Sequence, residues 1–424
     1  MREKIQQTNI QMTRNSTSPH SESVERVSSG VLFLKKPDAT KDPIEWYSSK
    51  IAGVPFALRN LLTFQRVNIK NLAVFMEDPK GDLKNSFDTI LKDSRIHQEI
   101  VWISNIQQLK EWIQTNPHPV YIFNGSALHD KKSLNELINS PQNNENELQA
   151  GFSVNPENLE DLLLSAQDNP ALFGSAELST NPGFPIYVPG SKEAEIQKRE
   201  DFKTLHEIQV EGSGLNHDSP ITRIFSRPAS RLLTRMFLNL PISPNQITLF
   251  SFCLGLASAY YFFQGSYLTS VIAATLLVLS TWVDGADGEI ARLKFMETEI
   301  GKKLDIYGDN IVHFFVFTAI GIGIFTRTGE NIYLYLGGLA GLGGLMAFFL
   351  LSPLLLKKRS PEKQLSLISE SDLAEKFANR DFIHFLFLVS LIDRLEIFII
   401  VAAIGANLFA GFLVVSRFLK FRTA

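Results

Sequence analysis

From residue 240 to its end, the chain is a series of apolar stretches separated by short charged loops, whereas residues before about 220 are polar and mixed. A helix needs roughly 20 apolar residues to cross the hydrocarbon core of a bilayer. We therefore predict an all-α transmembrane domain over residues 241–424. The fifth of its six spans is the shortest, because a charged segment, EKFANRDF, forms its beginning. The expected spans are about 245–263, 267–291, 304–326, 331–356, 376–392 and 396–418.

Loop charges predict how these spans are oriented, because Lys and Arg are enriched on the cytoplasmic side of a membrane. The loops after the second and fourth spans and the end of the chain are basic, whereas the opposite loops hold only Arg327 and Arg394. Both termini are therefore expected in the cytoplasm, with the protein in an inner membrane of bacterial or archaeal type. The polar first twenty residues predict no signal peptide. The basic residues are Arg292, Lys294, Lys302, Lys303, Lys357, Lys358, Arg359, Lys363, Arg417, Lys420 and Arg422.

Composition excludes several other classes of protein. The net charge of −3 gives no support for nucleic-acid binding. The single cysteine, Cys253, excludes an internal disulfide and a zinc site of the CxxC kind. Because Cys253 lies in an apolar run, we expect it to be a small buried residue.

The N-terminal half alternates short strand-like runs with helical patterns. Residues 1–26 are rich in polar residues and are expected to form a disordered tail. Runs such as GVLFL, NLAVFM, EIVWIS and PVYIFN are typical of strands, and the segments between them are typical of helices. This alternation predicts a cytoplasmic α/β domain with a mostly parallel sheet over residues 27–200, followed by a polar connector at 201–220.

Residues 221–240 predict a basic amphipathic helix at the membrane interface. Arg223, Arg227, Arg231 and Arg235 recur every four residues, and apolar residues fill the positions between them. Pro228 either kinks this helix or marks its start. Such a helix would bury its apolar stripe in the membrane and offer arginines to phosphates, either of an acceptor molecule or of anionic lipid.

Four acids stand out in the second and third spans. Asp284 and Asp287 are three residues apart, and Asp305 and Asp309 are four residues apart, so each pair shares one helix face. Acidic residues in apolar spans are costly and indicate function. Two antiparallel helices joined by a short loop would bring the carboxylates together, where they would repel one another without a counter-charge. We expect Mg²⁺ or Mn²⁺, with two ions in the site, rather than simple pairing with nearby basic residues.

Small residues beside these acids leave room for a ligand. Gly288 and Ala291 lie one turn beyond the first pair, and Gly301 lies one turn before Asp305. Arg292 adds a cation that suits a phosphate group. Asn245, at the start of the first span, is either a further ligand contact or, like Thr248, a helix-capping residue.

These positions together form a motif that resembles the signature of the CDP-alcohol phosphotransferase family, also called phosphatidyltransferases. The sequence matches D-x2-D-G-x2-A-R-x8-G-x3-D-x3-D at all eight fixed positions, over a resemblance that covers about residues 215–420. The positions are Asp284, Asp287, Gly288, Ala291, Arg292, Gly301, Asp305 and Asp309.

The resemblance implies a role for each matching residue. Asp284, Asp287 and Asp305 would bind metal, and Asp309 would contact the metal site and act as the general base on the acceptor hydroxyl. The CDP pocket would be lined by Asn245, Gly288, Ala291, Arg292 and Gly301, and Arg223, Arg227 and Arg231 are candidate contacts for an acceptor phosphate.

The resemblance also implies a metal-dependent transfer of a substituted phosphate from a CDP-linked donor to an alcohol, in phospholipid or polyol-phosphate synthesis. The donor would be CDP-diacylglycerol or a CDP-polyol, and the acceptor an alcohol such as a polyol phosphate. The fourth span contains YLGGLAGLGGLMAFF, whose small residues favour close packing either in a homodimer or within one subunit.

The N-terminal half resembles, more weakly, the cytidylyltransferase-like domains that are fused to this family in bifunctional enzymes of inositol-phosphate chemistry. The segment around SSKIAGVPFALRNLLTFQR carries the resemblance. The Gly-rich loop of an active domain is missing from SSGVLFLKKPDATKD, and Asn124 and Gly125 stand where a metal-binding Asp would follow the central strand. We therefore expect a nucleotidyltransferase-like domain that is inactive, with His129 and Asp130 as loop residues.

Three hypotheses follow. The first is a membrane phosphotransferase with a single activity. The second is a bifunctional enzyme that also makes its own CDP-alcohol, against which the missing Gly-rich loop counts. The third is a membrane scaffold or transporter without catalysis, against which the complete signature counts.

Overall fold

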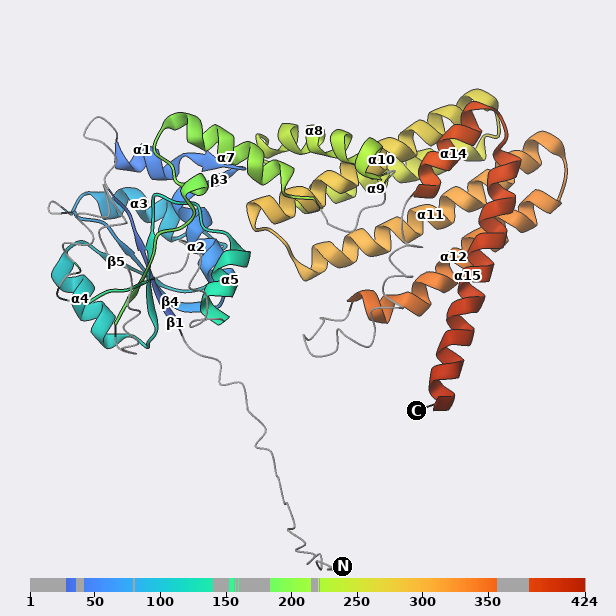
Figure 1. The fold of residues 1–424 in the computed structure, drawn as a ribbon. Helices are drawn as coiled ribbons and strands as arrows, with labels where there is room; N and C mark the ends of the chain where they lie inside the picture. Colours follow the sequence, from blue (N-terminus) through green and yellow to red (C-terminus); the bar gives the residue numbers. More distant parts are fainter. Residues whose placement is uncertain are drawn as a thin grey trace, which may run out of the picture.

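The computed structural model describes residues 28–35, 42–78, 81–139, 152–155, 157, 159, 184–214, 220, 222–356 and 381–423. Within these ranges the chain forms an α/β unit with a parallel sheet, followed by a region of long apolar helices (Figure 1). This is the predicted fold class. The expected tail at 1–26 lies outside the described residues.

The α/β unit is built on a six-stranded sheet in the order β5-β4-β1-β6-β8-β7. All neighbouring strands are parallel except β7 and β8, which are antiparallel. The buried strands read as continuous apolar runs because helices cover the sheet, as in other parallel sheets. The strands are β1 (Ser28–Phe33), β4 (Ile69–Phe75), β5 (Ile100–Ile103), β6 (Val120–Asn124), β7 (Phe152–Ser153) and β8 (Ile186–Val188), with a separate hairpin of β2 (Lys50–Ile51) and β3 (Val54–Pro55).

The helices of this unit lie in the crossovers between the strands. The most deeply buried is α2 (Phe56–Arg66), nine of whose eleven residues are buried. It follows the β2–β3 hairpin directly, so this hairpin and the helix start form one compact corner of the unit. The other helices are α1 (Pro43–Ser48), α3 (Leu83–Leu91), α4 (Ile106–Thr115), α5 (Lys131–Asn139) and the short η3 (Lys192–Ala194).

Helix α7 (Arg199–Glu211) joins the two parts of the structure (Figure 1). It occupies much of the segment in which we expected a polar connector. Phe202 and Leu205 belong to the apolar core of the α/β unit. One to two turns later, Val210 belongs to a second cluster that combines Ala52 of the α/β unit with residues of the helical region. The two parts therefore share a hydrophobic contact.

Helix α8 (Arg227–Leu238) has Pro228 in its first turn and follows a short π-helix, η4 (Thr222–Ser226). The helix buries Ser230 and Thr234 against the protein, whereas Leu232 and Met236 are more than half exposed. Its outward face is thus the apolar one. This arrangement suits a helix whose outer face meets lipid.

Five helices are long and apolar enough to cross a membrane, among the residues that the structure describes. Within the expected fifth span only α14 (Asp381–Leu391) is described, and its 11 residues reach about 16 Å at 1.5 Å per residue. The beginning of that span, at 376–380, lies outside the described residues, so six spans remain a prediction. The five helices are α9 (Pro244–Phe263), α10 (Tyr267–Lys294), α11 (Glu299–Thr328), α12 (Ile332–Leu356) and α15 (Leu395–Thr423).

Glycines allow these helices to approach one another closely. A Cβ on Gly337 of α12 would lie 2.9 Å from the Cα of Gly321 of α11, and one on Gly323 would lie 2.2 Å from the carbonyl oxygen of Phe262. Part of the glycine pattern of the fourth span therefore serves packing within the subunit. Gly338 and Gly344 have no described atom within 4 Å of an added Cβ.

The prediction of a buried Cys253 is wrong. Its side chain is exposed on α9. An apolar run does not predict burial in a membrane helix, because the outer surface of such a helix is as apolar as its interior.

Candidate active site

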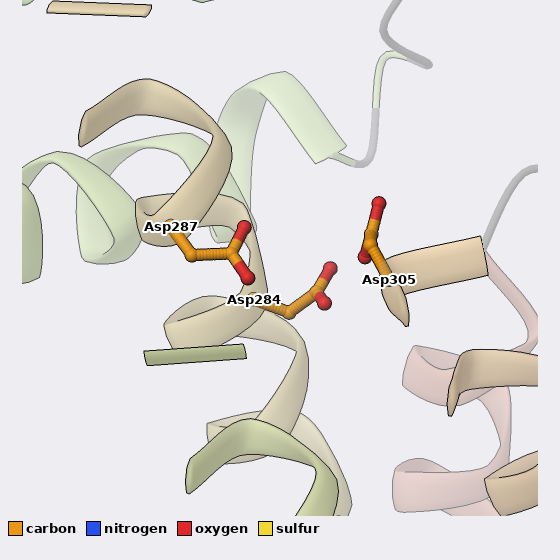
Figure 2. Close-up of side chains that lie close together, drawn as sticks. All are labelled: Asp284, Asp287 and Asp305. Carbon is orange, nitrogen blue, oxygen red and sulfur yellow. The ribbon is translucent and has the colours of Figure 1, made fainter. Parts of the chain in front are cut away.

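Three of the four predicted acids come together between α10 and α11. Asp284, Asp287 and Asp305 each offer a carboxylate oxygen, and these oxygens all lie within 4.8 Å of one another. In Figure 2 the carboxylate of Asp284 points toward that of Asp305, and Asp287 lies one turn along the same helix. Asp284 and Asp287 are buried, and Asp305 is half-buried.

Asp309 does not belong to this three-carboxylate group, whereas we expected four metal ligands. It lies one turn further along α11, where it lines a small cavity together with Asp284 and Asp305. Polar side chains of α9, α10 and α11 line the same cavity. They are Thr248, Ser251, Ser280, Thr281 and His313. Asp309 therefore faces the cluster from its inner side rather than completing it.

A short turn places the two acidic helices. α10 ends at Lys294, and its C-cap residue Phe295 adopts the left-handed conformation, with φ of 59°. Thr298 then caps the start of α11, and its Oγ1 accepts a hydrogen bond from the Gly301 amide at 2.9 Å. Left-handed residues commonly end helices, and Thr is a favoured N-cap. The resulting reversal sets Asp284 and Asp287 of α10 opposite Asp305 of α11.

A cavity of about 430 Å³ opens beside the cluster, on the side of this turn. Asp287 and Asp305 lie at its boundary, as do four consecutive residues from the end of the turn and the start of α11, Met296–Glu299. All five residues that were predicted to bind CDP line it: Asn245, Gly288, Ala291, Arg292 and Gly301. The volume falls in the range of sites for small molecules and cofactors.

The glycines of the motif have specific neighbours. A Cβ on Gly301 would lie 2.7 Å from Oδ1 of Asn245, so a side chain there would displace the Asn245 amide. A Cβ on Gly288 would lie 3.3 Å from Nη1 of Arg292. The Arg292 guanidinium is also held from the other side, because its Nε donates to the Ser213 carbonyl oxygen at 2.9 Å. Both glycines thus keep space for polar groups of the cavity.

The residues that we considered as caps of α9 have other contacts. Ser243 is the N-cap, and it forms a capping box with Gln246. Thr248 instead donates a hydrogen bond from its hydroxyl to the carboxylate of Asp287. It therefore fixes the orientation of one acid from a third helix, a role that the sequence indicates only through a polar residue in an apolar span.

Glu289 is a residue of the site that the sequence analysis did not single out. Its carboxylate is fully buried on α10, where it accepts hydrogen bonds from Arg227 at 2.7 Å, Ser230 at 3.2 Å and Thr234 at 2.7 Å. All three donors lie on α8. The buried face of α8 is polar because it surrounds this carboxylate.

The arginines that were predicted to bind an acceptor phosphate have different surroundings. Arg227 forms the ion pair with Glu289, and its side chain is only 12% exposed. Arg231 donates from Nη2 to the Glu211 carbonyl oxygen at 2.9 Å. Arg223 is exposed in the turn before α8. Of the three, Arg223 is the one that the described structure leaves open to solvent.

The donor set fits a hard divalent cation. Three carboxylates supply only oxygen ligands, which Mg²⁺, Mn²⁺ and Ca²⁺ prefer. Without a cation, their mutual repulsion would oppose the packing of α10 against α11. Asp284, Asp287 and Asp305 are therefore the residues that would hold a metal ion.

The carboxyl edge of the sheet in the α/β unit lacks an acid at the end of β6. Asn124 stands there, and its side chain donates to the Pro189 carbonyl oxygen at 3.1 Å and accepts from the Ser126 amide at 3.0 Å. His129 follows, packed against the rings of Phe64 and Phe123. Burial lowers the pKa of His129 to about 4, which keeps the ring neutral. His129 is thus a core residue of the loop.

Asp130 also has a local structural role. Its carboxylate accepts hydrogen bonds from the backbone amides of Lys132 and Ser133, at 2.8 and 3.0 Å. It therefore caps the start of α5. A cavity of about 270 Å³ lies between His129, Asp130 and α7, and the described residues that line it include neither Lys nor Arg.

Residues 241–409 match the model of the family described as CDP-alcohol phosphatidyltransferase. The match lies in the helical region and covers less than half of the chain. The match contains α9 to α14 and with them the three-carboxylate cluster and most of the 430 Å³ cavity's lining.

Several curated proteins are similar to parts of the chain. One from Archaeoglobus fulgidus, named "Bifunctional IPC transferase and DIPP synthase", is 32% identical over 146 residues, which are 34% of this chain and 28% of that protein. A protein of the same name from Aquifex aeolicus is 27% identical over 177 residues, 41% of this chain and 40% of that protein. The matched segments therefore span well under half the length of these relatives.

The Glu289–Arg227 pair leads to a prediction about stability. Glu289→Ala should lower the free energy of unfolding by about 3–5 kcal/mol, because it leaves the mostly buried Arg227 without its counter-charge. The matched control is Glu207→Ala, which removes an exposed ion pair with Arg235 and should cost at most about 1 kcal/mol. Unfolding of both variants in mixed micelles measures the difference. Equal losses would show that Arg227 reaches solvent when Glu289 is absent.

Proposed function

We propose that this protein is an integral membrane CDP-alcohol phosphotransferase. It transfers a substituted phosphate group from a CDP-linked donor to an alcohol and releases CMP. The observation that carries the proposal is the three-carboxylate cluster of α10 and α11 at the edge of a 430 Å³ cavity lined by Arg292 and the small residues of the family motif. The complete family motif counts against a scaffold or transporter.

The proposed roles of the residues agree with their positions. Asp284, Asp287 and Asp305 would hold two divalent cations, Mg²⁺ or Mn²⁺, which would neutralise charge on the donor's pyrophosphate. Thr248 orients Asp287 for this task by its hydrogen bond. Gly288, Ala291 and Gly301 leave space for the nucleotide, Asn245 offers it an amide, and Arg292 offers a cation to its phosphates.

Asp309 is the proposed general base. An alcohol is a poor nucleophile until its proton is removed, and a carboxylate within hydrogen-bond reach can accept that proton. Asp309 lines the small cavity on the inner side of the cluster, away from the larger cavity of the donor. An acceptor hydroxyl that enters there would lie between Asp309 and the donor phosphate, as in-line displacement requires.

The substrates are proposed by class. The donor is CDP-diacylglycerol or a CDP-polyol, and the acceptor is an alcohol such as a polyol phosphate, in phospholipid or polyol-phosphate synthesis. Arg223 is the best placed of the three arginines to meet an acceptor phosphate or anionic lipid, since it is exposed whereas Arg227 and Arg231 are partly buried. A homodimer through α12 is the proposed assembly.

A bifunctional enzyme is the second candidate, because the relatives carry that word in their names. We propose instead that residues 27–200 form a nucleotidyltransferase-like domain without activity. Asn124 and Asp130 are engaged in hydrogen bonds to the protein's own backbone, and Lys and Arg are absent among the described residues that line the neighbouring cavity.

The proposed orientation places six spans in the membrane with both termini in the cytoplasm, as the loop charges favour. Tags at the N-terminus and after Ala424 should both be protected from protease in right-side-out vesicles. A C-terminal tag that is cleaved from outside would reduce the count to an odd number of spans.

The reaction can be tested on the purified full chain in two arms. With a CDP-linked donor and an alcohol acceptor, CMP release should require Mg²⁺ or Mn²⁺ and stop in excess EDTA, because the cluster has three carboxylates and needs a cation. With CTP and an alcohol phosphate, no pyrophosphate should form. Turnover in EDTA would contradict the metal site, and pyrophosphate release would establish the bifunctional enzyme.

Asp309→Asn separates catalysis from binding. Asn keeps the size and an oxygen but cannot accept a proton, so turnover should fall on the order of a hundredfold to ten-thousandfold while metal-dependent donor binding largely survives. Asp284→Asn and Asp287→Asn should instead weaken metal and donor binding together. Asp88→Asn, on exposed α3, is the control for loss of a carboxylate. Near-normal turnover of Asp309→Asn would exclude it as the base, and loss of donor binding would make it a metal ligand.

A further inference from the structure

The turn between the two acidic helices is held by the α/β unit. The last carbonyl groups of a helix have no partner within it. At the end of α10, the Leu293 carbonyl oxygen accepts a hydrogen bond from Nη2 of Arg59, and the Lys294 carbonyl oxygen accepts one from Nη1 of Arg95, both at 2.7 Å. Both arginines belong to the α/β unit. They therefore cap α10 from outside the helical region.

Arg59 is fixed on its own side as well. It is 4% exposed and donates to the carbonyl oxygens of Ile51 and Ala52 in the β2–β3 hairpin. Arg95 is held by its ion pair with Asp93. Hydrogen bonds from a charged donor are stronger than those from a neutral one. A donor that is itself held in place restricts the position of its acceptor, here the end of α10.

Two further contacts extend this attachment into the turn. The ring of Phe295 packs against the core of the α/β unit, with the guanidinium carbons of Arg59 and Arg66 at 5.2 and 4.3 Å from its centroid. Two residues later, Glu297 forms an ion pair with Arg66. Arg66 thus contacts both a residue that anchors the turn and a residue that faces the cavity.

The same turn forms part of the wall of the proposed donor site. Met296, Glu297 and Thr298 line the 430 Å³ cavity, between Arg292 and Gly301. Whatever fixes this turn also fixes the width of the cavity. The three carboxylates of the cluster lie outside this turn, on the bodies of α10 and α11. Helix packing holds them there, and Thr248 also holds Asp287 by a hydrogen bond.

We infer that the α/β unit acts as a clamp on the donor site, and that Arg66 is a positioning residue for donor binding through Phe295 and Glu297. The inference rests on the proposed function and adds a task for the N-terminal half that needs no activity of its own. A clamp of this kind changes affinity for the nucleotide more than the rate of the chemical step. A contact that only docked the two parts would change neither.

The test uses Arg66→Ala in the full-length protein, because Arg66 is 31% exposed at its side chain and its loss leaves no buried charge. Metal-dependent binding of CMP should weaken about threefold to tenfold, with KM for the CDP donor raised to match and kcat within about twofold of the original. Arg66→Lys should recover much of the affinity, since it restores the charge opposite Glu297.

A double-mutant cycle with Glu297→Ala shows whether the two residues act together. The double variant should bind CMP no more weakly than Arg66→Ala, because the contact is already lost. Glu207→Ala is the matched control, since its pair with Arg235 is similarly exposed and neither residue lines the cavity. Its CMP affinity should equal that of the original protein.

The outcomes separate the two proposals. Binding and turnover by the original protein, with CMP affinity unchanged in Arg66→Ala, would overturn the clamp alone. Equal weakening in Arg66→Ala and in Glu207→Ala would also overturn it, since any loss of an ion pair near the junction would then suffice. Failure of the original protein to bind CMP or to use any CDP donor would overturn the proposed function and the clamp with it.

Discussion

Burying carboxylates between apolar helices is the constraint on which the helical region depends. Asp284 and Asp287 are 9% and 6% exposed, and their oxygens lie within 4.8 Å of those of Asp305. Buried negative charges need hydrogen-bond donors or positive charges beside them, and a fixed geometry that keeps these groups in place. Thr248 donates to one acid, the donor set invites a divalent cation, and the turn at Phe295 holds the helices at a fixed offset.

A second buried acid, Glu289, connects α8 to the helix that carries Asp284 and Asp287. Glu289 follows the Asp287–Gly288 pair directly on α10, and it collects Arg227, Ser230 and Thr234 from α8. The polar face of α8 therefore points inward, and its apolar face points outward. The packing of α8 and the orientation of the acidic helix are thus linked by one carboxylate.

The sequence predicts the parts of the site that depend on local spacing. Residues three or four apart share a helix face, so the pairs Asp284–Asp287 and Asp305–Asp309 indicate one site, and the parallel α/β unit follows from alternating strand and helix patterns. The partner of Arg227, 62 residues away, and the contact of Arg66 with Glu297, 231 residues away, have no local signature. Cys253 shows a related limit, since apolar neighbours do not distinguish the interior of a membrane protein from its lipid-facing surface.

Helix α7 has a consequence for how such a chain can be divided. Its first half completes the core of the α/β unit with Phe202 and Leu205, and its end joins Ala52, Leu238 and Ile290 in the cluster between the two parts. A break before α7 removes two side chains from the first core, and a break after it removes Val210 from the second cluster. Gene fission on either side of this helix would therefore leave one of the two clusters without side chains that complete it.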